Sequence, residues 1–131
     1  MPPQSGQPVC SGAMILAAAG LLKGKSATIN FALLQTLSGL GANPVAERYV
    51  HEGKLITAAG VSAGIDMAMY LTAMTEGETY VKMAQLVIEY CPEPPVNIPD
   101  LAAVPKDVES AARAFYKREM IKTNEATTAI N

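Results

Sequence analysis

The stretch QPVCSGAMILAAAGLL, residues 7–22, decides how the rest of the chain is interpreted. A cysteine, Cys10, follows a polar segment that contains proline and stands directly before small residues. The alanine-rich run after it predicts a helix over 11–20, which Ser11 can cap and Gly20 can end. Cys10 is therefore either a nucleophile on a sharp turn before a helix or a small buried apolar residue. A lone cysteine before a helix is more often the latter, so this stretch alone leaves both interpretations open.

Hydrophobic spacing and turn residues predict strands that alternate with helices along the chain. β-Branched residues indicate a strand at 26–31, and two further strands fit 44–60 around a turn at 51–54. Helical spacing predicts four more helices, at 32–42, 61–77, 78–90 and 105–122.

The ends of the chain are expected to be irregular. Residues 1–8 read as a loose lead-in and residues 123–131 as a frayed tail, with one domain between them at 9–122. Four prolines interrupt the segment 91–99 and exclude regular structure there.

Strands alternating with helices indicate an α/β sandwich with a mostly parallel sheet. The sequence supplies only about three strands, whereas open sheets usually hold about five or six. The predicted helices at 11–20 and 61–77 are apolar on nearly every side, and such helices are normally buried on more than one face. We therefore expect the fold to be completed by a second chain or by a segment that this sequence does not include.

The composition argues against several classes of function. The 131-residue chain has a net charge of −2, which gives no electrostatic basis for binding nucleic acid or an anionic membrane. No apolar run approaches the roughly 20 residues that span a bilayer, and the N-terminus lacks the pattern of a secretory signal. We expect a cytoplasmic protein whose two cysteines, Cys10 and Cys91, remain reduced.

Three blocks of sequence together resemble the DJ-1/PfpI family, and most closely its isonitrile hydratase-like branch. They are VCSGAMILAAAGLLKGKSAT from residue 9, ERYVHEGKLITAAGVSAGIDMAMYL from residue 47, and IEYCPEPP from residue 88. The resemblance runs over 9–95, which is most of the chain. It implies a flavodoxin-like α/β sandwich, of which this chain would be the C-terminal part, and commonly a homodimer.

The same resemblance implies roles for particular residues. Cys10 would be the nucleophile on the turn between strand and helix, and Ser11 takes the position of a family Ser or Thr whose backbone N–H borders the reaction site. Backbone N–H groups near Ser11 and Gly12 would then stabilise an intermediate. The segment 60–66 resembles a strand-to-helix turn near the cysteine, which makes Asp66 a candidate active-site residue or acid.

Two departures from the family pattern bear on catalysis. The family's N-terminal half, with an acidic residue that exchanges a proton with the substrate or the cysteine, has no counterpart in this sequence. A histidine that many relatives carry about twenty residues after the cysteine is matched here by Asn30, which cannot act as a base at neutral pH.

The remaining reactive side chains have simpler interpretations. His51 lies in the predicted hairpin turn, where we expect an exposed residue, and Cys91 is expected to be structural. Asp66 either lines the active site or is a helix residue whose carboxylate binds backbone N–H groups or a polar partner, and the sequence leaves both interpretations equally open. One histidine and two distant cysteines make no ligand set, so no metal or other cofactor is predicted.

Three functional hypotheses follow. In the first, the Cys10 thiolate attacks an electrophilic small molecule such as an isonitrile, and water releases an N-substituted formamide. In the second, the chain keeps the packing of the family without its chemistry and acts as an oligomeric or interaction domain, as a homodimer or with a complementing N-terminal half. The third, a ligand-binding domain of a transcription regulator, is disfavoured because no helix-turn-helix or basic stretch follows residue 95.

Overall fold

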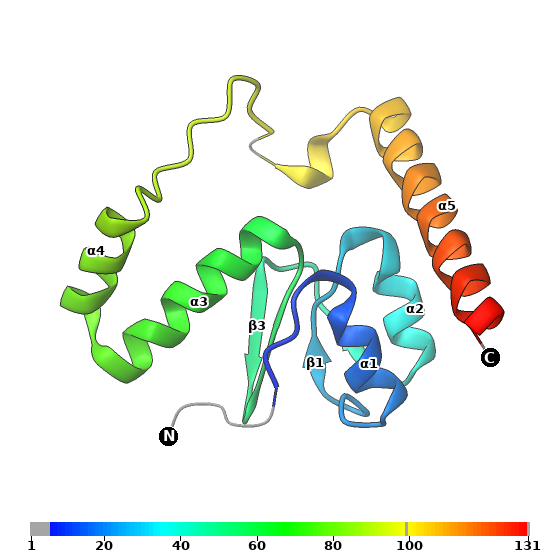
Figure 1. Cartoon of the computed structure of the whole chain (residues 1–131), viewed down its shortest axis with the longest axis horizontal. Coiled ribbons are helices and arrows are strands. Elements are labelled where there is room, and N and C mark those ends of the chain that lie inside the picture. The colour runs from blue at the N-terminus through cyan, green and yellow to red at the C-terminus, as the bar shows by residue number, and fades with distance from the viewer. Residues whose placement is uncertain (1–5, 99, 131) are drawn as a thin grey trace. The chain divides into compact units, whose positions relative to one another are not determined.

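The computed structural model describes residues 6–98 and 100–130, with side chains described up to residue 122. The chain divides into two compact units, unit 1 over Met1–Cys91 and unit 2 over Pro92–Asn131. Figure 1 shows the elements of unit 1, which are a 3₁₀ turn Cys10–Gly12, α1 Ala13–Ala18, β1 Ser26–Ala27, a 3₁₀ turn Phe31–Leu33, α2 Leu34–Gly39, β2 Asn43–Pro44, β3 Tyr49–Glu52, β4 Leu55–Ala58, α3 Val61–Glu76 and α4 Glu78–Val87. Unit 2 holds a 3₁₀ turn Leu101–Ala103 and α5 Lys106–Ile130.

The named strands form a hairpin and a short parallel pair. β3 and β4 are antiparallel and are joined by a turn at 53–54, where Gly53 has a φ of +63°. A left-handed conformation of this kind is what a two-residue hairpin turn requires. β1 and β2 are parallel, in the register that places Ser26 opposite Asn43. The α/β class predicted from the alternation of strands and helices is confirmed, with both parallel and antiparallel pairing.

The segment that leads to Cys10 is a further parallel partner of β4. Val9 forms a parallel bridge with Ala58, and the carbonyl oxygen of Pro8 accepts a hydrogen bond from the Ala58 N–H at 3.1 Å. β4 is thus paired along both edges, and all four of its residues are buried.

This pairing differs from the loose lead-in predicted for 1–8. Residues 1–5 lie outside the described part of the chain, but residues 6–8 are held against β4. Proline cannot donate a hydrogen bond in a sheet. Pro8 is tolerated here because the pairing uses its carbonyl oxygen.

One cluster of the core of unit 1 lies between β4 and α3. Its buried members are Ile56 and Ala58 from the strand, and Ala63 and Met67 from the helix. The two helix residues are four positions apart and therefore share one face of α3. The partly buried residues Tyr49, Ala59, Tyr70 and Leu71 pack against this cluster.

Several predicted elements are shorter in the structure. The predicted helix at 11–20 begins as a 3₁₀ turn and its α-helical part ends at Ala18, while the predicted strand at 26–31 pairs with β2 only at Ser26–Ala27. Beyond β1 the chain continues beside β4, where the Thr28 N–H donates to the Thr57 hydroxyl oxygen at 2.8 Å.

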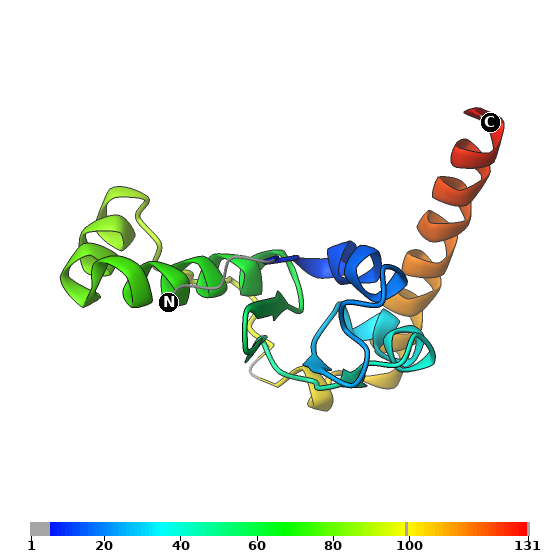
Figure 2. The same cartoon turned by 90° about the horizontal axis from the view of Figure 1, so that it is seen from below.

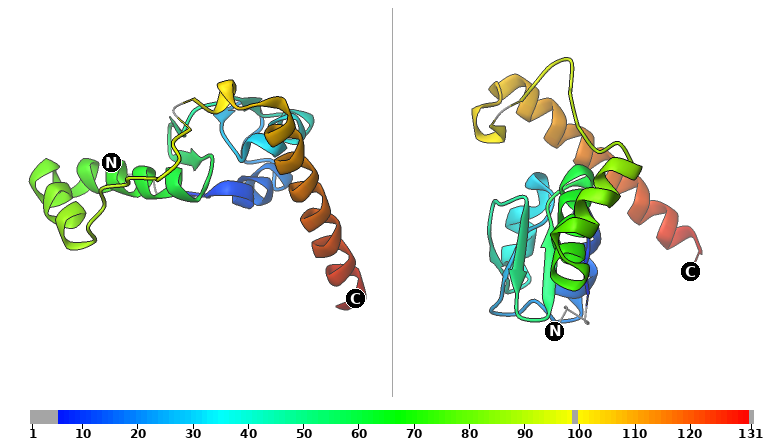
Figure 3. Two further views of the ribbon diagram at one scale, coloured as in Figure 1. Left: turned by 90° about the horizontal axis from the view of Figure 1, so that it is seen from above. Right: turned by 90° about the vertical axis from the view of Figure 1, so that its left-hand side faces the viewer.

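Helix α4 packs mainly against α3, and Figures 2 and 3 show it folded back beside that helix. It ends at Val87, three residues before the predicted end at residue 90. The helix does not continue because Glu89 takes a φ of +51°, which no residue of an α-helix adopts.

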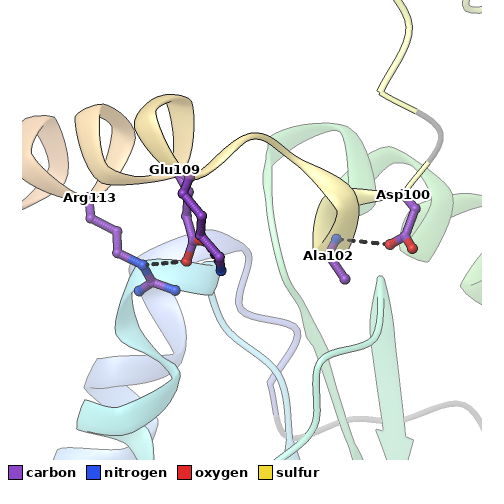
Figure 4. A network of polar contacts seen from close by, with 5 residues as sticks. Asp100, Ala102, Glu109 and Arg113 are labelled. Carbon is purple, nitrogen blue, oxygen red and sulfur yellow. Dashed lines mark hydrogen bonds and ion pairs between the residues drawn. The ribbon is translucent and has the colours of Figure 1, made fainter.

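In the described part of unit 2, two local hydrogen-bond networks begin its helical segments. The Asp100 carboxylate accepts a hydrogen bond from the Ala102 N–H at 2.8 Å and so begins the 3₁₀ turn. In the first turns of α5 the Glu109 carboxylate binds Lys106 at 3.0 Å and Arg113 at 2.9 Å, and Figure 4 shows this network. Hydrogen bonds from these two cations lower the pKa of Glu109.

Helix α5 runs to Ile130 and is longer than the predicted helix at 105–122. The segment 123–130, which we expected to be frayed, contains neither glycine nor proline, so no residue in it breaks a helix. Among the residues described here, no helix combines the length and hydropathy that crossing a bilayer requires.

Gly64 of α3 packs closely on Val9, the residue between the lead-in and Cys10. A Cβ atom at position 64 would lie 2.8 Å from Cγ1 of Val9, well inside van der Waals contact. Because successive helix residues differ by about 100° in direction, Gly64 faces Val9 while its neighbour Ala63 faces the core. The absence of a side chain at position 64 is what allows the helix to pack here.

We predict that Gly64→Ala destabilises the protein by about 1–3 kcal/mol, since the added methyl group overpacks against Val9. The matched control is Gly39→Ala in α2, where a Cβ would meet nothing within 4 Å. That substitution should be neutral or stabilising, because alanine has the higher helix propensity. Urea unfolding of both variants measures the difference, and equal stabilities would contradict the packing described.

Candidate active site

Cys10 lies on a sharp bend between the lead-in strand and the first helical turn. Val9 before it is extended, with φ −114° and ψ 143°, and the 3₁₀ turn starts at Cys10 itself and runs directly into α1. Cys10 has a φ of +56°, a left-handed conformation that costs an ordinary L-residue about 1–2 kcal/mol. Strained residues of this kind persist only where the surrounding structure holds them, and they cluster at functional sites.

The surroundings of Cys10 separate the two interpretations of this residue. The residue is partly exposed, whereas Ala13 and Ala17 on the following helix are buried. Cys10 is therefore not a fully buried apolar residue. The bend expected from the sequence is present, and the side chain lies at the start of a helical turn.

The two residues after the cysteine shape this bend. The Gly12 N–H donates to the carbonyl oxygen of Val9 at 3.0 Å and closes the turn. This donor is thus engaged in the backbone, which differs from the expectation that it stabilises an intermediate. Ser11 is exposed and lies within the 3₁₀ turn. The N-cap of α1 is Gly12, so the predicted capping role of Ser11 is wrong. The Ser11 N–H remains the expected donor at this position.

The segment 60–66 forms the strand-to-helix turn that the sequence led us to expect. Gly60 is the N-cap of α3, and its carbonyl oxygen accepts the first helical hydrogen bond from the Gly64 N–H at 2.9 Å. Since Gly64 packs on Val9, this turn lies beside the residue that precedes Cys10.

Asp66 lies on the other flank of the same helix. It is about 200° around α3 from Gly64, so its side chain does not share the flank that packs on Val9. Its Oδ2 atom is 2.6 Å from Nε of Arg48, and its Oδ1 atom accepts a hydrogen bond from the Tyr90 hydroxyl at 2.5 Å. Of the two interpretations of Asp66, the structure supports the helix residue with polar partners.

The contact with Asp66 changes the acidity of Tyr90. The hydrogen bond to the Asp66 carboxylate, partial desolvation and the negative charge of Asp66 all raise the pKa of Tyr90, while the nearby Arg48 lowers it. The net direction is upward from the ordinary value of 10.0. The protonated phenol is therefore the form that the fold favours.

Two other predicted positions have local structural roles. Asn30 is the N-cap of a 3₁₀ turn, and its side chain accepts a hydrogen bond from the Ala32 N–H at 3.0 Å. His51 lies within β3 and not in the hairpin turn as predicted, although it is exposed as expected. Its Nδ1 atom is 2.9 Å from the Tyr70 hydroxyl oxygen, and its Nε2 atom is 3.0 Å from the Gly53 carbonyl oxygen.

Both cysteines lie in the described part of the chain, and neither is in a disulfide bond. Cys91 is exposed. Over 6–98 and 100–122, no group of three His, Cys, Asp or Glu side chains lies close enough together to hold a metal ion. The partners of Asp66, Arg48 and Tyr90, were not identified from the sequence. The signal that could have found them was the presence of an acidic residue in an apolar helix, which requires a donor nearby.

A model of the DJ-1/PfpI family matches residues 7–74, just over half of the chain, and this range includes the bend at Cys10. The chain belongs to the DJ-1/PfpI family. An isonitrile hydratase from Pseudomonas putida is 42% identical to it over 105 residues, a match that covers 80% of this chain and 46% of that protein. The resemblance seen in the sequence is thereby confirmed.

Solved structures of DJ-1/PfpI proteins show the same fold. The crystal structure of a ThiJ/PfpI family protein from Pseudomonas syringae is 40% identical and superposes with a TM-score of 0.78, covering 86% of this chain and 46% of that one. An AraC family transcriptional regulator from Pseudomonas putida, 15% identical with a TM-score of 0.58 over 63% of this chain and 45% of its own, shares the fold alone. The chain thus spans about half the length of each of these relatives.

The raised pKa of Tyr90 predicts a loss of stability at alkaline pH. Because the folded-state pKa lies above that of the unfolded chain, the contribution of the phenol is complete below about pH 10 and disappears as the pH rises through the folded value. At about pH 8 the natural chain should be more stable than Tyr90→Phe by about 1 kcal/mol, a low value because the site is partly exposed. Urea unfolding across the alkaline range measures this difference, and one that stays constant above about pH 11 would contradict the assignment.

Proposed function

We propose that this chain carries the nucleophile of an isonitrile hydratase-like reaction, and that the nucleophile is Cys10. The observation that carries the proposal is the left-handed bend at Cys10, between a segment bridged to β4 and a helical turn. The identity of 42% to an isonitrile hydratase supports the choice of substrate class.

The reaction proceeds in two steps. The Cys10 thiolate attacks the terminal carbon of an isonitrile, a new S–C bond forms, and a proton added to that carbon gives a thioimidate. Water then adds to the same carbon, the S–C bond breaks, and the N-substituted formamide leaves with the thiolate restored. Each turnover consumes one isonitrile and one water molecule and involves no oxidant or reductant.

The roles of the neighbouring residues follow from the geometry of the bend. The Ser11 N–H is the proposed donor toward charge that develops during the attack, since the Gly12 N–H is engaged with Val9. We do not assign the proton donor to Asp66, because one of its carboxylate oxygens pairs with Arg48 and the other accepts a hydrogen bond from Tyr90. The proton donor is therefore a group other than Asp66.

We predict that Cys10→Ala abolishes formamide production and that Cys91→Ala leaves it unchanged. The assay incubates the full chain with cyclohexyl isonitrile and measures the formamide by mass spectrometry, with circular dichroism to verify folding. In parallel, if Cys10 is the nucleophile, iodoacetamide should alkylate it about three-fold or more faster than Cys91. Formamide production that is equal in Cys10→Ala and the natural chain would refute the proposal.

A second candidate function is that of an interaction domain which pairs with a second copy of itself. Helix α4 presents a stripe of apolar residues to solvent, with Tyr80 48%, Met83 50% and Val87 75% exposed. These residues recur at helical spacing and form one face. Monomeric proteins rarely leave a continuous apolar face of this kind uncovered.

For this second function we predict a dimer of about twice the 13.8 kDa chain mass in size-exclusion chromatography with light scattering. Val87→Lys should shift the protein to the monomer, because dimer formation would bury an unpaired charge in an apolar interface, which costs free energy. Lys82→Ala, on the polar side of the same helix, is the matched control and should leave the dimer intact. A natural chain that runs as a well-folded monomer would exclude this function.

A further inference from the structure

We propose that Arg48, Asp66 and Tyr90 form a lock that holds the C-terminal end of α4 on α3 and fixes where the chain leaves unit 1. The proposal assigns Asp66 a positioning role and is independent of any chemistry at Cys10. It rests on three observations within unit 1: the contacts of the carboxylate, the weak packing of α4, and the backbone conformation at its end.

The Asp66 carboxylate joins three separate parts of the chain. Arg48 directly precedes β3, Asp66 lies in α3, and Tyr90 follows α4. One carboxylate oxygen pairs with the Arg48 guanidinium at 2.6 Å and the other accepts the Tyr90 hydroxyl at 2.5 Å. The two partners lie 18 and 24 residues from Asp66 in sequence. Because the hydrogen bonds involve a charged group, they are stronger than bonds between neutral groups.

Helix α4 has little else to hold it. None of its residues, all of which the structure describes, is buried. Its main contact is α3, and its apolar stripe faces solvent. A helix with few buried contacts opens readily, so a single polar anchor at its end has a large effect on its stability.

The backbone after α4 is shaped to deliver Tyr90 to this anchor. Glu89 has a φ of +51°, a conformation that L side chains other than Asn and Asp rarely adopt. The Tyr90 N–H then donates to the Gln85 carbonyl oxygen at 2.9 Å, which closes the turn. The lock explains why Glu89 adopts this unfavourable conformation. The left-handed backbone at Glu89 allows the phenol of Tyr90, the next residue, to reach Asp66 on α3. Unit 1 ends one residue later, at Cys91.

The test is hydrogen–deuterium exchange of the full chain, read by mass spectrometry. In Tyr90→Phe, which keeps the ring and loses only the hydroxyl, we expect the amides of Glu78–Val87 to exchange about five-fold faster or more, while those of β4 are unchanged. Lys82→Ala is the control, since Lys82 lies on the same helix outside the apolar stripe, and its exposed pair with Glu78 at 3.8 Å contributes little. Exchange in Tyr90→Phe that equals the control, or that rises equally in α4 and β4, would overturn the proposal.

A double-mutant cycle separates the lock from independent contacts. If Asp66 and Tyr90 act together, Asp66→Asn combined with Tyr90→Phe accelerates exchange in α4 no more than the stronger single variant. If the acceleration of amide exchange in the double variant equals the product of the accelerations in the two single variants, the residues act separately. This result would also overturn the proposal.

Discussion

The contact between Val9 and Gly64 is the constraint on which the rest of unit 1 depends. Only a residue without a side chain lets α3 approach the lead-in this closely, since a Cβ atom at position 64 would lie 2.8 Å from Val9. On its other side Val9 pairs with Ala58 of β4. Held between a strand and a helix, Val9 determines the direction in which the chain enters the bend. The left-handed conformation of Cys10 follows because the next residues must start a helical turn from that point.

Helix α3 contacts the core, the segment before Cys10 and the partners of Asp66, and each of these contacts uses a different side of the helix. One face carries Ala63 and Met67 into the core against β4. Gly64 packs on the strand that leads to the cysteine, and Asp66, on the opposite flank, binds Arg48 and Tyr90. The remaining side is also apolar, which is why the sequence pattern of this helix shows no clear polar face.

The sequence predicted the alternation of strands and helices, the hairpin and the bend at Cys10, since each depends on local signals such as helical spacing, turn residues and small residues after the cysteine. It was less successful where a distant partner decides the outcome. The lead-in pairs with β4 although its prolines disfavour a strand, because the pairing needs only the Pro8 carbonyl oxygen. His51 lies in β3 and not in the turn, since the register of the hairpin places the reversal at 53–54.

The sequence by itself determined the family, the α/β class and the cysteine that stands before a helical turn, because a chemically distinctive motif and hydrophobic periodicity are properties of neighbouring residues. Only the tertiary structure decided what the carboxylate of Asp66 does and which backbone donors the bend retains. Asp66 lies 18 residues from Arg48 and 24 from Tyr90, and hydrogen bonds over such separations are set by how helices and strands pack. The Gly12 N–H donates to Val9, only three residues earlier, but the turn that directs it there depends on the path that the chain takes from the segment bridged to β4 into the helix.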